Sequence, residues 1–548
     1  MRKRLDFFWS KNRYRLPLIL TAVLAYGFSL LSVSVGNDDT AIPFYYQEGQ
    51  DVQMGRWTLF VLNKVFHFAD YAPFFLELVG VLFLVLAASL FCVVYRRITE
   101  EDDVLGYSIF SCVFVSCPTI SELNFYYTHN GVDMSFCLIA LAAYLFDVLL
   151  VEKGSRKKQI GLCLGQLGLL LVTIGCCESM IIVYAVAILS VFYLRIRQGQ
   201  HAVSLCHKLF SFAAVGAICI LTVVLRNFMR AFIVWAFRLY AVGDGESWRS
   251  VGESLLDVFA PGGAAELKML MKRFWLVYHV NAFVYLPIFS YAAACTVLWI
   301  DALVQAIRRR QLWSLLAVLG IYLAPFVLIL AEWKVPAYRS AQFLPITAAF
   351  GMFVLYLAVR DRLRKWGGRI VVVLMTVLVF NQAADMNHSF YIEQMLYQNN
   401  CRMLNDIAVE LGKTYNTNLP VVFRGQNETS YVYAKYYIAP YDSLGYRMVA
   451  LVSDLVDPQL KEKYFVFEGY NYGVEIYSDF FTYAYAAFDN NSEQFTIFLD
   501  YLGYDLKPLR DKSLLETADT QWQEMPSWPA EGSIRQYDKY ILIRVGNQ

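Results

Sequence analysis

The stretch LPLILTAVLAYGFSLLSVSVGNDD, residues Leu16–Asp39, decides the fold. Its apolar part, Leu16–Val35, has the length of about 20 residues that a helix needs to cross a bilayer. The first acidic residues after it are Asp38 and Asp39. Two adjacent carboxylates at the mouth of a membrane helix are costly to hold near hydrocarbon, so they indicate a function. The alternative is a helix cap or a solvated loop end, where such residues are also common.

The composition is that of a membrane protein. Of the 548 residues, 58% are hydrophobic and 17% are charged, whereas soluble domains carry about 25% charged residues. The net charge of +1 argues against a nucleic-acid partner, because proteins that bind nucleic acid carry a basic surface. The 11 cysteines and 6 histidines show no spacing typical of a zinc site. The lipid bilayer is therefore the first partner that the sequence predicts.

About eleven apolar segments have the length of a membrane span, so the sequence predicts an α-helical polytopic membrane protein. The segments are Leu16–Val35, Pro73–Tyr95, Val104–Pro118, Gly131–Val151, Ile160–Cys176, Met180–Leu194, Leu209–Leu225, Trp275–Trp299, Leu312–Ala331, Phe343–Val359 and Ile370–Ala384.

The charges between the spans predict the orientation in the membrane. Lysine and arginine gather in every second connection, for example at Arg96-Arg97, Arg156–Lys158 and Arg308–Arg310. Connections rich in these residues stay in the cytoplasm. We therefore expect a multi-pass protein of the cytoplasmic membrane whose N-terminus is cytoplasmic. The acidic pair and the C-terminal tail would then be extracytoplasmic.

The tail after the last span has the composition of a small soluble domain. Ile392–Leu411 has the apolar spacing of a helix. Pro420–Phe423, Tyr464–Phe467 and Tyr540–Val545 have the pattern of buried strands, separated by helix-forming stretches. The sequence thus predicts two domains: residues 1–385, the membrane domain, and residues 386–548, an extracytoplasmic α/β domain.

Two outer segments have the pattern of amphipathic helices. In Met54–Phe68 the apolar residues Met54, Trp57, Val61, Val65 and Phe68 share one helical stripe. The same spacing recurs in Leu267–Trp275. Such helices lie in the membrane interface or pack against neighbouring loops, and the sequence does not separate these alternatives.

The residues at the outer edge suit sugar transfer from a lipid phosphate. A carboxylate can take the proton of an acceptor hydroxyl, and cations can neutralise the departing phosphate. Arginine is well suited because its planar fork holds two phosphate oxygens. The candidate catalytic residues are Asp39 and Asp38, and the candidate substrate-binding residues are Arg56, Trp57, Glu122, Tyr126, Lys334 and Arg339.

Each candidate has a structural alternative. Glu122, next to the aromatic run Phe125–Tyr127, could form a shelf for a sugar or cap a short helix. Arg339 is the best phosphate candidate, although a snorkelling arginine has the same sequence pattern. Glu178 lies in a tight hairpin, and we expect it to be solvated. The first-loop carboxylates could hold one Mg²⁺ or Mn²⁺ ion but are too few to predict a metal site.

Several short motifs resemble those of a known enzyme family. They are Asn37-Asp38-Asp39, Gly55-Arg56-Trp57, Ser121–Phe125, Pro336–Arg339 and MPSWPAEGSIRQYDKYILIRV at Met525–Val545. Together with the order of spans and the terminal outer domain, they resemble the GT-C superfamily. More narrowly, they resemble the bacterial serotype-converting glucosyltransferases (Gtr type II) that decorate O-antigen. The resemblance implies an undecaprenyl-phosphate hexose donor, with glucose as the first choice, a cell-surface glycan acceptor outside the membrane, and catalysis by one first-loop aspartate.

Other classes of protein share parts of this pattern. A glycan polymerase or ligase would also use arginines on the outer side of the membrane. A lipid-linked glycan flippase or transporter would have about as many spans, but it should carry paired ionisable residues at mid-bilayer. A surface-binding protein without catalysis would not need about eleven spans.

Overall fold

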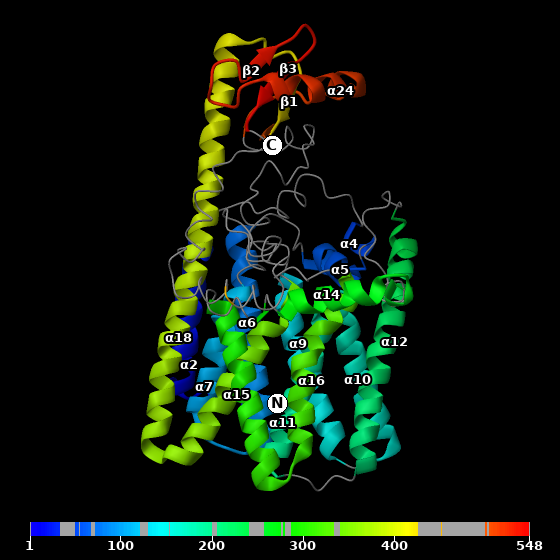
Figure 1. Cartoon of the computed structure of the whole chain (residues 1–548), viewed down its shortest axis with the longest axis vertical. Helices are drawn as coiled ribbons and strands as arrows, with labels where there is room; N and C mark the ends of the chain where they lie inside the picture. The colour runs from blue at the N-terminus through cyan, green and yellow to red at the C-terminus, as the bar shows by residue number, and fades with distance from the viewer. Residues whose placement is uncertain are drawn as a thin grey trace.

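The chain forms an upright bundle of helices with a small sheet above one end (Figure 1). The computed structural model describes residues 2–32, 50–53, 55–66, 72–120, 130–152, 154–199, 205–239, 257–275, 278–279, 286–333, 340–425, 451, 499–500 and 503–546. In this part of the chain, 10 helices are long and apolar enough to cross a membrane. The prediction of an α-helical polytopic membrane protein is therefore confirmed.

Every predicted span overlaps a helix, although the span predicted as Trp275–Trp299 starts eleven residues before α15. The long helices are α2 (Asn12–Leu31), α6 (Pro73–Thr99), α9 (Asn130–Val151), α10 (Arg156–Ile174), α11 (Met180–Arg197), α12 (Leu205–Phe237), α15 (Leu286–Arg309), α16 (Leu312–Leu323) with η5 (Ala324–Phe326) and α17 (Val327–Glu332), and α18 (Phe343–Thr414). A short helix, α1 (Arg2–Trp9), precedes them. The predicted span Val104–Pro118 is the shorter helix α7 (Val104–Val115), followed by η1 (Pro118–Ile120).

The bundle has inner and outer helices. In α7 all residues from Gly106 to Val115 are buried, which is typical of a helix that is apolar all round and lies inside a protein. In α12, by contrast, many apolar side chains are exposed, among them Ile220 at 70% and Phe228 at 67%. A stable protein would expose such a surface to lipid rather than to water. We assign α12 to the lipid-facing periphery.

α18 contains the last two spans, Phe343–Arg362 and Gly367–His388. The chain reverses direction between them, since a Cβ atom on Gly368 would lie 3.6 Å from Tyr356. In a straight helix these two residues would be about 18 Å apart. Beyond His388 the helix leaves the bundle and rises to the C-terminal sheet (Figure 1). The helix predicted in the tail is thus a continuation of the last span, and the division at residues 385/386 stays a prediction.

The C-terminal sheet has the strand order β1-β3-β2. β1 (Val421–Arg424) pairs in parallel with β3 (Ile541–Arg544), and β2 (Ile534–Gln536) pairs antiparallel with β3. Side chains alternate between the two faces of a strand. Val421 and Phe423 accordingly pack against the end of α18, while Val422 faces the cluster that includes α24 (Lys512–Gln521).

Two of the three predicted strands are confirmed as β1 and β3. The third, Tyr464–Phe467, lies outside the described residues. The sequence analysis missed β2 and the single turn η8 (Trp522–Glu524).

The end of the bundle away from the sheet holds buried ion pairs. Asp147 on α9 is fully buried and accepts hydrogen bonds from Arg97 Nε at 2.8 Å and Arg195 Nε at 2.7 Å. The two guanidinium groups offset the cost of burying this negative charge. The arginines come from the ends of α6 and α11, so this pair of contacts joins three spans.

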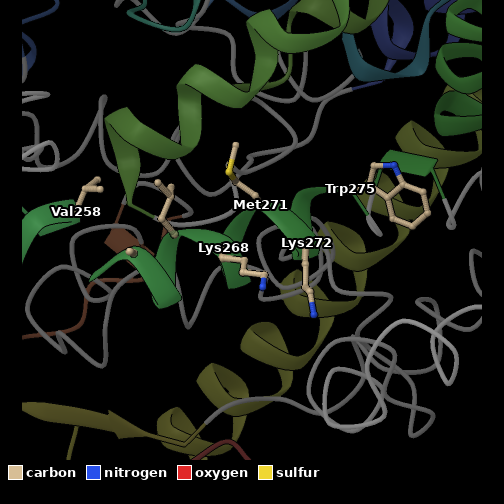
Figure 2. A pocket seen from close by; sticks show the side chains of 7 residues that line it. Val258, Lys268, Met271, Lys272 and Trp275 are labelled. Carbon is tan, nitrogen blue, oxygen red and sulfur yellow. The ribbon is translucent and has the colours of Figure 1, made fainter. Parts of the chain in front are cut away.

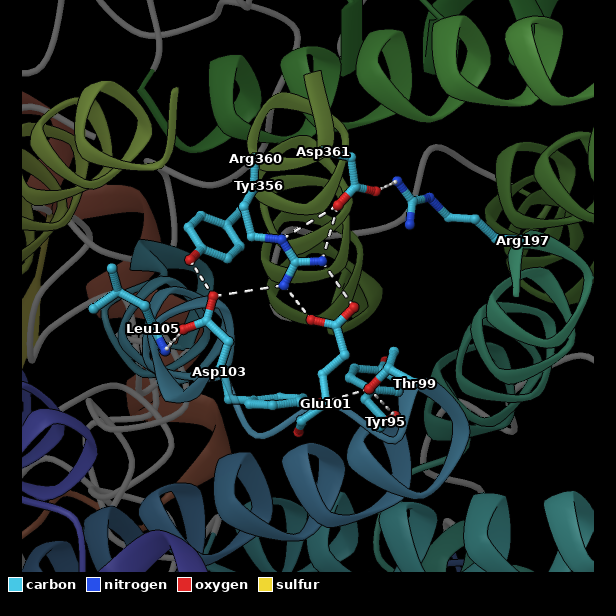
Figure 3. A network of polar contacts seen from close by, with 10 residues as sticks. Tyr95, Thr99, Glu101, Asp103, Leu105, Arg197, Tyr356, Arg360 and Asp361 are labelled. Carbon is cyan, nitrogen blue, oxygen red and sulfur yellow. Dashed lines mark hydrogen bonds and ion pairs between the residues drawn. The ribbon is translucent and has the colours of Figure 1, made fainter. Parts of the chain in front are cut away.

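A second network at this end surrounds Arg360 on α18 (Figure 3). Its Nη2 donates to Glu101 Oε1 at 2.7 Å and to Asp361 at 2.9 Å, while Tyr356 donates to Asp103. These contacts join the connection between α6 and α7 to Arg360 on α18. Both segments carry or adjoin arginines, and the charge pattern predicted that such segments lie on the same side of the membrane. The side of the membrane on which this end lies stays a prediction.

Three short helices lie at the opposite end of the bundle: α4 (Gln50–Gln53), α5 (Trp57–Phe66) and α14 (Gly263–Trp275). α14 lies across the ends of the spans (Figure 1). The stripe predicted for residues 54–68 is partly wrong, since Val65 is 60% exposed whereas Leu59 and Leu62 are buried. α5 packs on two sides, against α6 and α9 and against α12, so it has no single apolar face.

Candidate functional site

The start of α5 is fixed to the turn that follows α10. The backbone N–H of Thr58 donates to the carbonyl oxygen of Gly175 at 2.9 Å, and the Thr58 hydroxyl donates to that of Val172 at 2.9 Å. A Cβ atom on Gly175 would lie 2.2 Å from Thr58 Oγ1 and 2.7 Å from Trp57 Nε1. Glycine at 175 thus allows α5 to approach the end of α10 closely.

Gly55 brings Arg226 of α12 to the start of α5. Gly55 has a φ of +83°, which favours glycine. The Nε of Arg226 donates to the Gly55 carbonyl oxygen at 3.3 Å. A Cβ atom on residue 55 would lie 1.8 Å from Arg226 Nη2. The arginine side chain therefore occupies the space that the absent side chain leaves.

Glu178 forms an ion pair with Arg226. Burial raises the pKa of Glu178, and the charges of Arg226 and Arg56 oppose this rise. Its side chain is 35% exposed, so the expectation of a freely solvated Glu178 is wrong. The pairing of the α10–α11 turn with α12 explains the difference, because it covers the carboxylate.

Two further arginines lie near this ion pair. Arg56 and Arg230 are both close enough to Arg226 to repel its positive charge. Neither guanidinium has a hydrogen bond or an ion pair with any residue in the described part of the chain. Three arginines and the carboxylate of Glu178 thus lie close together at this point. Such a group is suited to an anion with several oxygens, such as a phosphate. We call Arg56, Arg226 and Arg230 the arginine cluster.

Trp57 lies behind the arginine cluster and is only 8% exposed. Its ring belongs to a cluster with Val52, Phe60 and Ile233. Its Nε1 is buried without a hydrogen-bond partner among the described residues. The ring therefore supports the position of Arg56, and a direct contact with substrate stays a prediction.

Most of the predicted site residues lie outside the described residues: Asp38, Asp39, Glu122, Tyr126, Lys334 and Arg339. Their described neighbours in the chain are Ser32, Ile120, Trp333 and Ser340. Ser32 follows α2, Ile120 ends η1, Trp333 follows α17, and Ser340 lies three residues before the start of α18. The segments that hold the predicted residues thus connect to the ends of these helices.

Two buried acids lie at this end. Glu77 on α6 is 3% exposed and Asp133 on α9 is 1% exposed, and the two carboxyl groups are close enough to influence each other. Glu77 Oε1 and Asp133 Oδ1 have no hydrogen-bond partner in the described part of the structure. An acid inside an apolar span is the signal that could have identified Glu77.

The described residues contain no group of three or more His, Cys, Asp or Glu side chains that could hold a metal ion. The pair Glu77 and Asp133 supplies two carboxylates only. Oxygen-coordinated Mg²⁺ or Ca²⁺ needs six or more ligands, most of which water would have to supply in a site that is closed to water.

One protein family matches the chain. The family model described as Glucosyl transferase GtrII matches residues 27–356, which is well over half of the 548 residues. The matched region contains the arginine cluster, Glu178 and both buried acids, and it ends before the chain reversal in α18. No curated protein and no solved structure matches the chain.

Proposed function

The chain belongs to the family of the glucosyl transferase GtrII, and from this premise we propose that it is a polyprenyl-phosphate-dependent glucosyltransferase of the GT-C type. The donor is glucose linked to undecaprenyl phosphate, and the acceptor is a cell-surface glycan such as O-antigen. The reaction takes place on the outer side of the cytoplasmic membrane. The N-terminus is then cytoplasmic, and the domain of residues 386–548 is extracytoplasmic.

The observation that carries this proposal is the arginine cluster at the end of the bundle. When the acceptor hydroxyl attacks the anomeric carbon, the bond from that carbon to the phosphate oxygen breaks and its electrons remain on the phosphate. A phosphodiester with one negative charge thus becomes a phosphomonoester with two. Preorganised cations stabilise this developing charge. Arg56, Arg226 and Arg230 bring three guanidinium groups together there, and Arg226 is paired with Glu178.

The other predicted residues receive their roles from the same reaction. Asp39, with Asp38 as its neighbour, takes the proton of the acceptor hydroxyl. Lys334 and Arg339 add to the binding of the donor phosphate. Glu122 and Tyr126 hold a sugar through hydrogen bonds and ring contacts.

A transfer assay with two donors tests the proposal. The purified protein is incubated with the glycan acceptor and with radiolabelled glucose on either undecaprenyl phosphate or uridine diphosphate. We expect radiolabel on the glycan with the lipid-linked donor only. Transfer from the nucleotide donor in the absence of lipid would contradict the proposal. A requirement for an oligosaccharide on a polyprenyl diphosphate would favour the polymerase or ligase alternative.

A further inference from the structure

α14 has one face in the protein and another that is exposed. Gly263, Leu270 and Phe274 are buried, and the Phe274 ring lies 4.6 Å from that of Phe326 in η5. About 100° further round the helix, Met271 is 40% exposed and Trp275 is 37% exposed. The helix is thus attached to the bundle through its buried face and lies across it (Figure 1). This is the position of a helix at a membrane interface.

A groove runs along the exposed face of α14 (Figure 2). Its volume is about 420 Å³, and Val258, Leu267, Met271 and Trp275 give it apolar walls. Lys268 and Lys272 also line it. An apolar groove that carries cationic groups fits a molecule with a hydrocarbon part and an anionic part.

The two lysines are available for an anion. They are four residues apart on one helix, so their Cβ atoms are about 5–6 Å from each other. Neither ammonium group forms a hydrogen bond or an ion pair with the residues that the structure describes. Two free cations at this spacing attract the same phosphate group.

We propose that the groove on α14 binds an anionic phospholipid of the surrounding membrane leaflet, with its phosphate on Lys268 and Lys272. The acyl chain lies along Leu267, Met271 and Trp275. A free phosphate would leave this apolar wall exposed to water, whereas a lipid covers it. The arginine cluster is a separate feature, since it is built on α4, α5 and α12 whereas α14 packs against α17. The proposal therefore does not depend on the identity of the sugar donor.

Lipid binding to the purified, delipidated full chain tests the proposal. The probes are phosphatidylglycerol and phosphatidylcholine, and the Kd for each is measured by native mass spectrometry. A lysine near an anionic lipid contributes about 1 kcal/mol, which is about fivefold in Kd. We expect Lys268→Gln and Lys272→Gln each to raise the Kd for phosphatidylglycerol about fivefold and the double variant about 25-fold. The Kd for phosphatidylcholine should stay unchanged.

Arg273→Gln is the matched control. Arg273 is on the same helix and carries the same charge, but it lies outside the groove and contacts Met269. We expect less than a twofold change for this variant. Equal binding of the two lipids by the wild-type chain, or an equal loss for Arg273→Gln, would show a diffuse surface attraction and overturn the proposal.

A further variant separates the groove from folding and from the donor. Met271→Gln should raise the Kd for both lipids, because it removes part of the apolar wall of the groove but no charge. Lys268, Met271 and Lys272 are exposed, so the unfolding temperature of their variants should stay within about 2 °C of wild type. The lysine variants could instead bind phosphatidylglycerol normally and raise the KM for the lipid-linked sugar donor. The groove would then bind the donor, and the proposal would be wrong.

Discussion

Gly55 and Arg226 fit together so closely that a Cβ atom on residue 55 would lie 1.8 Å from Nη2 of the arginine. Real Cβ atoms do not approach other atoms this closely, so any side chain at residue 55 must displace the guanidinium. The ion pair of Arg226 with Glu178 would then break or move. Because this pair joins α12 to the α10–α11 turn, residue 55 controls the geometry of the arginine cluster.

The first prediction is that Gly55→Ala lowers kcat/KM for glucose transfer at least tenfold. The displacement of Arg226 by about 1 Å or more is the cause, since such shifts in an active site can cost about 100-fold. The positive φ of residue 55 adds strain of about 1–2 kcal/mol. Gly199→Ala controls for strain alone, because Gly199 has a φ of +72° and a Cβ atom there would meet nothing within 4 Å. Equal activities of the two variants would contradict the role of Gly55.

The second prediction concerns the donor phosphate. Arg56→Ala should raise the KM for the lipid-linked donor about tenfold, which corresponds to about 1.4 kcal/mol. Arg56→Lys should restore part of the affinity, because the charge returns but the planar fork does not. Arg238→Ala serves as the control, since Arg238 is an exposed arginine that follows α12 and has no described contact with the cluster. An unchanged donor KM in a folded Arg56→Ala protein would move the phosphate site to Arg339.

The third prediction concerns stability at the other end of the bundle. Asp147→Asn should lower the free energy of unfolding by about 3–5 kcal/mol, because it removes the buried negative charge that Arg97 and Arg195 share. Glu152→Gln should cost about 0–1 kcal/mol, because Glu152 pairs with Arg97 but is 39% exposed. Thermal unfolding in one detergent measures both variants. A similar loss for the two would show that burial of Asp147 does not set the cost.

The sequence predicts the spans well because length and hydropathy are properties of one continuous segment. It also predicts the apolar spacing of α14 and the strands β1 and β3, whose patterns are equally local, but not which part of the α14 stripe is buried. The contact of Arg226 with Glu178 joins residues 48 positions apart, and only the packing of α12 against a turn brings them together. The two-sided burial of α5 has the same origin, since its neighbours α6, α9 and α12 come from distant segments.

The fourth prediction is the orientation. A cysteine placed at Ser513 on α24 should react with an impermeant thiol reagent in intact spheroplasts, and one at Ser155 before α10 should not. Cys206 is exposed and lies at the start of α12, so the test requires Cys206→Ser in both variants. Labelling at Ser155 alone would reverse the orientation and place the arginine cluster in the cytoplasm.

The last prediction concerns the base, which we assign to Asp39. The first described segment ends at Ser32, the residue that follows α2. The six residues between Ser32 and Asp39 can extend over about 20 Å, so the first loop can bring a carboxylate to the donor. Asp38 is one residue nearer the helix end and better placed for a structural hydrogen bond. For this reason we expect Asp39→Asn to have the larger effect.

Asp39→Asn keeps the shape of the side chain and removes its ability to take a proton. General-base catalysis contributes about 10²–10⁴-fold, so kcat should fall by at least about 100-fold while the donor KM stays within about twofold. Asp38→Asn is the matched control and should show a smaller effect on both constants. If both folded variants retain more than about a tenth of wild-type transfer, the loss is below the range of a general base. Glu122, two residues after the end of η1 in the chain, would then be the next residue to test.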